Sequence, residues 1–410
     1  MLGKHYNRME TAMTTIAIIG AGIVGSSAAY YLKKQGYQQV TIFDDGNGQA
    51  TKAAAGIICP WFSKRRNKAW YQLARLGADC YQDLIKELQK EGLSTHFYKQ
   101  TGVYLLKKNE DKLEELYQLA NRRKQESPLI GDLAIRCRSD IKADFPDLQG
   151  FEQLVWASGA ARVDGADLCQ CLLEASGYQV VKKRVSISIE KQGYLVDGIV
   201  FDRLILAAGA WLPELLEPLG YQVDIRPQKG QLMDYHIANV ATDNYAVVMP
   251  EGELDIIPFE HGRISVGASH ENDKGYDLEP DLAVLEALEQ EALTYYPKLS
   301  AASDISYRVG IRAYTRDFSP FFGQVPQLPG VYAASGLGSS GLTVGPLIAQ
   351  QLVALLLGQK ASLDTSQYPI HYYIRRINHA KRMRGYFPLF PHLPFFELGY
   401  FLQILVKGQT

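Results

Sequence analysis

A glycine pattern near the N-terminus, Gly20-x-Gly22-x-x-Gly25, constrains the fold more than any other feature of the sequence. It follows a short apolar stretch that favours a strand, and it opens a segment whose small and apolar residues share one helical face. The first glycine permits a tight turn, the second lets the backbone approach a pyrophosphate, and the third lets the helix pack closely on the sheet. The free N–H groups and positive dipole end of the helix would face the pyrophosphate. The pattern therefore predicts a dinucleotide-binding turn, with Ile23 and Val24 at the helix start.

The elements around this turn form a βαβ unit, with strands expected at 15–19 and 40–43 and a helix at 23–34. Asp44 and Asp45 follow the second strand, and the Asp44 carboxylate can accept hydrogen bonds from the ribose of an adenosine. A carboxylate there disfavours a 2′-phosphate, so NADP is not expected. A structural turn without a ligand remains the alternative, and the pattern does not separate FAD from NAD.

Length, charge and cysteine content limit the class of protein. The chain of 410 residues exceeds what one hydrophobic core organises, which favours two domains. Lys and Arg number 43 against 44 Asp and Glu, so no nucleic-acid partner is expected. The five cysteines include no CxxC pair, which argues against a disulfide framework and a metal site and favours a cytoplasmic location.

Three further segments separate the two candidate cofactors. They are the small-residue stretch 50–58, the strand end 204–211 and the glycine-serine stretch 335–346, which opens a helix. Together with the glycine pattern, in this order, they resemble the D-amino-acid oxidase superfamily of FAD enzymes, closest to its glycine oxidase and D-amino-acid dehydrogenase branch. Sarcosine-oxidase-like members tether their flavin through a cysteine. Because no cysteine follows Cys171, the resemblance implies FAD bound without a covalent link.

The resemblance also indicates which residues hold the cofactor. Small residues let backbone pass close to a flat ring, and Thr51 can donate a hydrogen bond to a phosphate or ribityl oxygen. N–H groups of the glycine-serine stretch can stabilise negative charge on the reduced flavin. Besides the residues of the βαβ unit, those expected to hold FAD are Thr51, Lys52, Ala54, Ala55, Gly56, Ile57, Val185, Ala208, Gly209, Trp211, Gly336, Gly338, Ser339, Ser340, Gly341, Leu342 and Thr343.

Arg312 is the catalytic candidate that the resemblance places most directly. It lies in Gly310-Ile311-Arg312-Ala313-Tyr314-Thr315, which resembles the family segment whose arginine binds the substrate carboxylate through two parallel hydrogen bonds. Arg308 is expected to be a surface or packing residue. Asp255 stands where the family often has a tyrosine over the substrate, so it either holds a substrate ammonium group or faces solvent. His270 can help to remove a proton from an incoming ammonium group, and a structural role is its alternative.

These residues imply an oxidoreductase that acts on a small amino acid or amine, with hydride passing to the flavin and the imine hydrolysing in water. The electron acceptor is O2 or a quinone, and the sequence does not choose between them. A related flavoenzyme acting on a 2-hydroxy acid or another small carboxylate is one alternative, with His270 as its base. A flavin-binding protein without catalytic activity is another.

The expected fold class is α/β, with a Rossmann-like FAD-binding domain and an α+β substrate domain. The parallel sheet of the first domain is discontinuous in sequence, and the sheet of the second is mixed or antiparallel. The expected divisions assign 14–75, 145–220 and 305–365 to the FAD-binding domain and 76–144 and 221–304 to the substrate domain. Strands are expected at 178–189, 194–196, 199–201 and 204–208.

Two basic stretches lie outside these motifs. The run at 64–68 either attracts an anionic substrate or is a solvated helix start. The segment 366–410 is a basic and aromatic tail, whose apolar stretch 395–406 is shorter than the about 20 residues that span a bilayer. Such a tail suits peripheral contact with an anionic membrane, and packing over the FAD-binding domain is the alternative.

Overall fold

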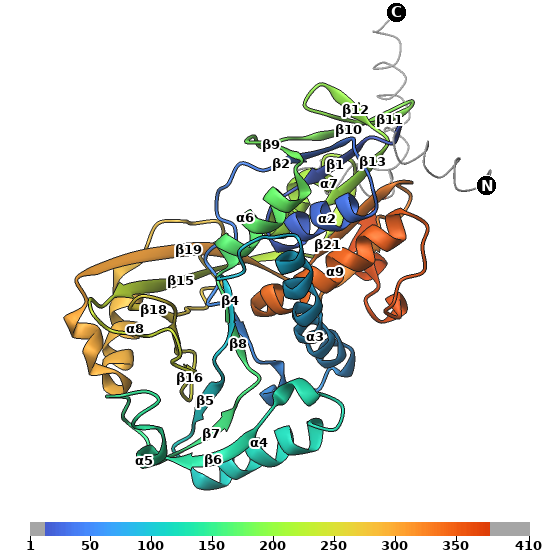
Figure 1. Cartoon of the computed structure of the whole chain (residues 1–410). Helices are drawn as coiled ribbons and strands as arrows, with labels where there is room; N and C mark the ends of the chain where they lie inside the picture. The colour runs from blue at the N-terminus through green and yellow to red at the C-terminus, as the bar shows by residue number, and fades with distance from the viewer. Residues whose placement is uncertain (1–12, 378–410) are drawn as a thin grey trace, which may run out of the picture.

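The computed structural model describes residues 13–377 and contains two large sheets. Figure 1 shows them in two lobes of an elongated molecule. The chain enters each lobe more than once, so both lobes are built from separate stretches of sequence. The predicted α/β fold class is confirmed.

The first lobe contains a six-stranded sheet in the order β20-β21-β13-β1-β2-β9. Every pairing in it is parallel except that between β20 and β21. Residues 16–19 are all buried because their strand lies at the centre, with helices over the sheet. The strands are β1 (Ile16–Ile19), β2 (Val40–Phe43), β9 (Gln179–Val181), β13 (Arg203–Leu206), β20 (Phe321–Gln324) and β21 (Val331–Ser335).

Four helices form the main covering layer of this lobe. Helix α2 packs against α6 and α9, and α3 packs against α9. A Cβ at Gly345 would lie 2.6 Å from the Cγ2 of Ile23, so glycine at this position lets α9 approach the first turn of α2. The four are α2 (Ile23–Lys34), α3 (Lys68–Lys90), α6 (Gly165–Ser176) and α9 (Gly341–Leu356).

The second lobe contains an eight-stranded mixed sheet in the order β19-β15-β18-β17-β16-β5-β7-β6. Only β16 and β5 pair in parallel. Helices α4 (Glu110–Arg123), α5 (Arg138–Ile141) and α8 (Leu282–Tyr295) complete this lobe. The strands are β5 (Val103–Leu106), β6 (Leu133–Cys137), β7 (Gln153–Ala157), β15 (Arg226–His236), β16 (Val247–Met249), β17 (Asp255–Pro258), β18 (Arg263–Gly267) and β19 (Asp304–Tyr314).

Three small sheets complete the described structure. They contain β3 (Ile57–Ile58), β8 (Ala161–Val163) and β4 (Tyr98–Gln100); β10 (Ile187–Glu190), β11 (Gly193–Val196) and β12 (Ile199–Phe201); and β14 (Tyr221–Val223) with β22 (Ile374–Arg376). Helix α7 (Leu212–Leu216) follows β13.

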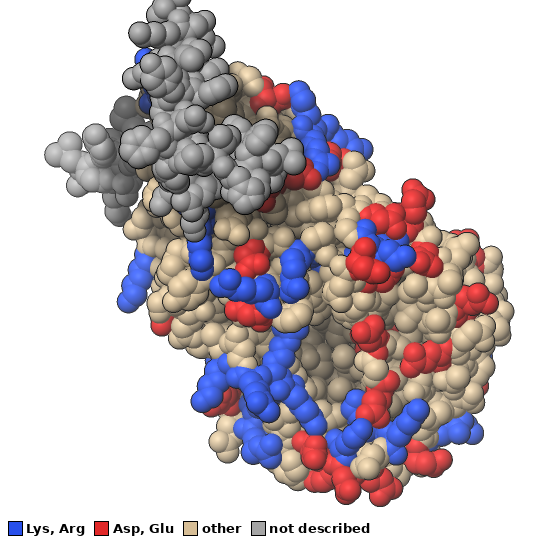
Figure 2. All heavy atoms as spheres, turned by 180° about the vertical axis from the view of Figure 1, so that it is seen from behind, with Lys and Arg blue, Asp and Glu red and all other residues tan. Residues whose placement is uncertain are grey.

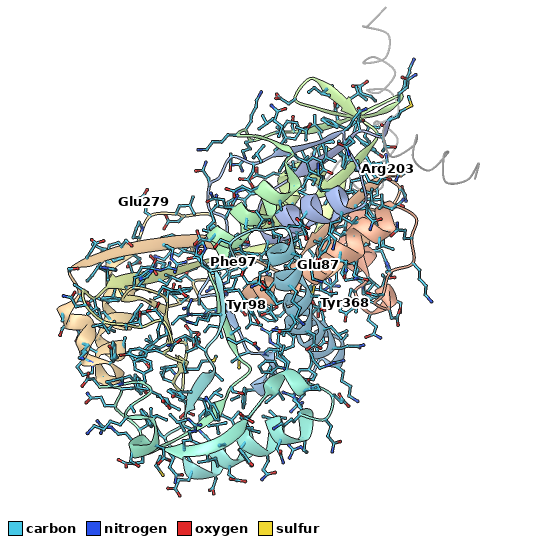
Figure 3. All side chains as sticks on the ribbon, viewed as in Figure 1. Glu87, Phe97, Tyr98, Arg203, Glu279 and Tyr368 are labelled. Atoms are coloured by element: carbon cyan, nitrogen blue, oxygen red, sulfur yellow. The ribbon has the colours of Figure 1, made fainter. Side chains whose placement is uncertain are left out.

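Aromatic packing joins α3 to the β3-β8-β4 sheet at the centre of the molecule. Phe97 and Tyr98 lie beside α3 at this junction (Figure 3). The Tyr98 ring stacks on Tyr81 of α3, with centroids 5.4 Å apart, and its hydroxyl accepts a hydrogen bond from Gln82. Phe97 is buried. The helix therefore has a fixed position against the strands that border the second lobe.

Some sequence predictions differ from the structure. The single strand expected at 178–189 is two strands, β9 and β10, which belong to different sheets. The segment between them carries Lys183 and Arg184, whose charged groups reach solvent and pair with Asp197 and Glu214. Alternation in the sequence does not reveal that break. Strands β7 and β19 belong to the eight-stranded sheet, although the divisions expected at 145 and 305 assign them to the other domain.

One described helical stretch, Gly338–Leu356, is long and apolar enough to cross a membrane. Most of it is buried against α2 and α3, so packing inside the protein accounts for its apolar character. The basic and aromatic tail predicted at 366–410 is described only as far as residue 377, where β22 pairs with β14. The remainder of that prediction lies outside the described residues.

Arg308 of β19 connects the second lobe to the loop after β2. Its guanidinium donates to both Asp234 carboxylate oxygens, at 2.6 and 2.9 Å, and to the Ser265 hydroxyl at 3.0 Å. It also donates to the backbone oxygens of Lys52 and Ala54, at 3.1 and 3.2 Å. All five of its N–H donors are therefore used, which makes it a packing residue that fixes this loop.

Replacing this arginine should destabilise the protein, because Asp234 would keep a largely buried carboxylate without its cation. Arg308→Met should lower the free energy of unfolding by about 2–4 kcal/mol in urea unfolding followed by tryptophan fluorescence. Adding Asp234→Asn to that variant should recover part of the loss. An unfolding curve for Arg308→Met that matches the wild type would show that this network contributes no net stability.

Candidate functional site

A cavity of about 670 Å3 runs from the end of β1 in the first lobe to the end of β5 in the second. Figure 2 shows the molecule hollowed on one face, with Lys and Arg side chains gathered along one side of the hollow. The walls of the cavity come from the glycine-pattern turn, the 47–57 loop, the end of β13, the loop before α9 and the second sheet. It therefore lies where the two lobes meet.

The glycine-pattern turn forms one end of the cavity. Gly20 has φ +103°, and a Cβ there would lie 2.3 Å from the Ala207 oxygen, so only glycine fits without a shift. Gly22 is the N-cap of α2 and has no side chain to cap it. Within residues 13–377 the N–H groups of Gly22 and Val24 have no acceptor. These donors, at the positive end of α2, form an anion-binding position.

Thr51 and Asp44 complete the end of the cavity at the glycine-pattern turn. The Thr51 hydroxyl accepts from the Ile23 N–H at 3.0 Å, which leaves its own proton free to donate. Asp44 accepts from the Ala21 N–H at 2.5 Å and from Gln49 at 2.6 Å. These bonds fix the carboxylate at the end of β2, the position predicted to face a ribose.

Most of the residues predicted to hold FAD line this one cavity, although they come from five separate stretches of sequence, around 20–24, 44–57, 185, 208–211 and 338–343. They are Gly20, Gly22, Ile23, Val24, Asp44, Asp45, Thr51, Ala54, Ala55, Gly56, Ile57, Val185, Ala208, Gly209, Trp211, Gly338, Ser339, Ser340, Gly341, Leu342 and Thr343.

Three predicted residues do not line it. A Cβ at Gly25 would lie 1.8 Å from the Gly20 oxygen, so this glycine serves the packing of α2 on the turn. Gly336, with φ +74°, packs against Thr315. Lys52 belongs to a separate depression and contributes only its backbone oxygen to the Arg308 network.

The glycine-serine loop before α9 is fixed by two aromatic residues that the sequence analysis missed. The Ser339 N–H donates to the Tyr314 hydroxyl at 3.1 Å, and Trp70 Nε1 donates to the Ser340 hydroxyl at 3.3 Å. Both contacts bridge distant segments, so no spacing in the sequence signals them. They hold the loop at the cavity wall.

Arg312 reaches the cavity from β19. It donates through Nη1 to the Ser269 oxygen at 2.7 Å and to Gln228 at 3.3 Å. A Cβ at Gly230 would lie 2.5 Å from that nitrogen, so glycine at 230 makes room for the guanidinium. Nε and Nη2 have no acceptor, and the side chain no carboxylate partner, in the part of the chain that the structure describes. Two parallel donors therefore remain for a ligand carboxylate.

Asp255 and His270 line the same cavity from β17 and the segment after β18. Asp255 is half-buried and lines the cavity, where burial raises the pKa of its carboxyl to about 8. His270 Nδ1 lies 3.4 Å from Glu253 Oε2 without hydrogen-bond geometry. Burial and the positive charge of Arg312 lower the pKa of His270, so the ring is largely neutral at pH 7.

The shape of the cavity fits FAD. One helix start provides free N–H donors for a pyrophosphate, and a carboxylate stands one strand away for a ribose. Small residues at 53–56, a second helix start and Arg312 line the same cavity. Within residues 13–377, no group of three or more His, Cys, Asp or Glu side chains is placed to hold a metal ion. The donor set is thus that of a flavin dinucleotide site.

Comparison with known proteins agrees with this geometry. Residues 15–355 match the family model described as FAD dependent oxidoreductase (DAO). The chain is 42% identical to an uncharacterised oxidoreductase, YurR, of Bacillus subtilis, over 87% of this chain and 98% of that protein. It is 30% identical to a glycine oxidase of Pseudomonas aeruginosa, over 86% and 97% of the two chains.

A solved structure gives the same result. The crystal structure of iminodiacetate oxidase from Chelativorans sp. BNC1 superposes with a TM-score of 0.82 at 34% identity, covering 86% of this chain and 98% of that one. The predicted resemblance is confirmed, and so is FAD as the cofactor. The chain belongs to the DAO family of FAD-dependent oxidoreductases.

Proposed function

We propose that this enzyme oxidises the C–N bond of a small amino acid or amine that carries a carboxylate. The observation that carries the proposal is the Arg312 guanidinium, which faces the cavity without a carboxylate partner among the described residues. An unpaired, partly desolvated cation is costly unless a ligand neutralises it, so a substrate carboxylate is its natural partner. FAD, when bound, accepts the hydride from the carbon that carries the amine.

The protein's own groups position the substrate and move one proton. Arg312 holds the carboxylate, which fixes the distance of the neighbouring carbon from the ring. Asp255 lines the same cavity from β17 and, once ionised, can pair with the ammonium group and take its proton. Apolar side chains in the wall, including Leu105 and Met249, exclude water from this end. The neutral amine that remains is the form that releases hydride.

The named relatives support this substrate class. One relative is a glycine oxidase, and a structural neighbour is an iminodiacetate oxidase; both names describe amines with a carboxylate on the adjacent carbon. A 2-hydroxy acid would use the same arginine, so the substrate panel for this enzyme includes one.

Removing the Arg312 guanidinium should reduce kcat/KM for an amino-acid substrate by about 10²–10⁴-fold, because two charge-assisted hydrogen bonds are lost. Arg312→Met tests this in steady-state assays, and Arg312→Lys should recover only part of the loss since an ammonium cannot form the paired bonds. Arg316, which is exposed and binds Asp224 outside the cavity, provides the matched control Arg316→Met. Equal kcat/KM for Arg312→Met and wild type would remove the proposed role.

The pH dependence of kcat/KM should report the ionisation of the Asp255 carboxyl. Its pKa is raised to about 8, so the carboxyl is protonated below that pH and becomes a base above it. We expect kcat/KM to rise with pH through about 8. In Asp255→Asn this rise should disappear, while the rise caused by deprotonation of the substrate's own ammonium group should remain. An unchanged profile in Asp255→Asn would assign the ionisation to another group.

For the electron acceptor we propose O2 or a quinone, with the enzyme acting in the cytoplasm and contact between its tail and a membrane as a further proposal. Reduced enzyme mixed with air-saturated buffer in a stopped-flow spectrometer separates the acceptors. Recovery of the oxidised flavin spectrum within the turnover time indicates an oxidase. Recovery much slower than turnover, together with fast recovery on adding a soluble quinone, indicates a dehydrogenase.

A further inference from the structure

We infer that the cavity contains a second anion-binding position, formed by Lys107 with Arg65 at the mouth, and that the substrate is an amine bearing an anionic group on each side of its nitrogen. This inference rests on the proposed function. It names the substrate class more narrowly, as secondary amines of the dicarboxylate type. Sequence reasoning did not assign Lys107 to the site, and it considered Arg65 only as part of the run at 64–68, which either attracts an anionic substrate or is a solvated helix start.

The ion pairs around the mouth distinguish these two cations from their neighbours. Lys64 pairs with Glu115 at 2.9 Å, and Lys112 pairs with Glu251 at 2.9 Å. Neither of these two lysines lines the cavity.

Lys107 and Arg65 do line the cavity, and within residues 13–377 neither has a carboxylate at ion-pair distance. Lys107 is half-buried, and burial lowers its pKa although Glu251 opposes that effect. Arg65 is exposed and lies over the Trp70 ring, 4.5 Å from its centroid. Of these four cations, the two without an ion-pair partner are thus the two that line the cavity.

The order of strands in the second sheet places these charges in a row. Arg312 is on β19, Asp255 is on β17, and Lys107 follows β5, which lies two strands beyond β17. Residues of the intervening strands, Gly230 and Met249, also line the cavity, so the sheet forms one continuous wall. Since β17 lies between β19 and β5 in the sheet, and neighbouring strands lie about 4.8 Å apart, Lys107 is on the far side of Asp255 from Arg312.

The row holds a cation, a carboxyl that becomes negative when it ionises, and a second cation. A ligand of complementary charge has a carboxylate, an ammonium group and a second anion in that order. An amino acid with an uncharged nitrogen substituent would satisfy Arg312 and Asp255 but would leave Lys107 without a partner. The second anion therefore belongs on the nitrogen substituent, and its distance from the nitrogen is set by the spacing of the strands.

A series of N-substituted glycines tests this arrangement. N-carboxymethyl-, N-(2-carboxyethyl)- and N-(3-carboxypropyl)glycine are each compared with the matching neutral carboxamide, and kcat/KM is measured for all six together with glycine and N-methylglycine. We expect at least one acid to exceed its own amide by about tenfold or more in the wild type, the ratio that one charge-assisted contact provides.

The variants Lys107→Met and Lys107→Gln should reduce that acid-to-amide ratio to about two or less, and Arg65→Met should reduce it in part. Their sequence neighbours Lys108 and Arg66 are exposed and do not line the cavity, so Lys108→Met and Arg66→Met are matched controls that should keep the wild-type ratio. Bound FAD per chain is measured for every variant, so that a misfolded protein is recognised.

The outcomes separate this inference from the proposed function. If no acid exceeds its amide by more than about twofold in the wild type, while amides or N-methylglycine are oxidised, the second anion position is wrong and the proposed function stands. If a ratio of tenfold persists in both Lys107 variants, Lys107 is not its source and the inference is likewise overturned. If no amine in the panel bleaches the flavin under anaerobic conditions, the proposed function fails, and the inference fails with it.

Discussion

Close backbone contact at the end of β1 is the constraint on which the rest of the structure depends. A Cβ at Gly20 would lie 2.3 Å from the Ala207 oxygen, and one at Gly56 would lie 2.0 Å from the Val163 oxygen. Gly20 lets the turn before α2 lie against the end of β13, and Gly56 lets the loop after β2 lie against β8, without side chains between the backbones. Helix α2 consequently begins at the cavity wall with the N–H groups of Gly22 and Val24 free of acceptors among the described residues, and a dinucleotide can lie along the ends of the strands.

The second sheet supplies the chemistry that the first lobe lacks. Strand β19 carries Arg308 and Arg312 four residues apart, and the two side chains have different roles. Arg308 uses all its donors within the protein and fixes the loop that borders the cavity. Arg312 is anchored through one nitrogen and keeps two donors for a ligand. One strand therefore fixes the loop that borders the cavity and carries the arginine that we propose binds the substrate.

The parts of the fold that local patterns determine could be predicted from the sequence. The strands at 40–43 and 199–201 and the helix at 23–34 have the predicted bounds, because hydrophobic periodicity and glycines mark their ends. The resemblance correctly assigned the chain to its family from the segments that border the cofactor cavity. Periodicity did not reveal the break between β9 and β10, nor did it show that β7 and β19 join the second sheet. Sheet membership depends on contacts between distant segments, which no local pattern records.

The candidate site could likewise be predicted only in part from the sequence. Arg312 was predictable from its segment, whereas the position of Asp255 at the cavity wall was not, since it depends on where β17 lies in the sheet. Tyr314, Trp70 and Lys107 gave no signal, because each acquires its role through a neighbour that is far away in sequence. Lys52 was assigned to the cofactor from its place in a motif, whereas in the structure it lines another depression.

The content of FAD in the purified protein tests the central claim most directly. The protein is denatured by heat, and the flavin released into the supernatant is identified and measured against the protein concentration. The account predicts a yellow protein that releases intact FAD in an amount equal to the chain, because the cavity binds the dinucleotide without a covalent link. A colourless protein that takes up no FAD from an excess would contradict it, as would flavin that stays attached to the denatured chain.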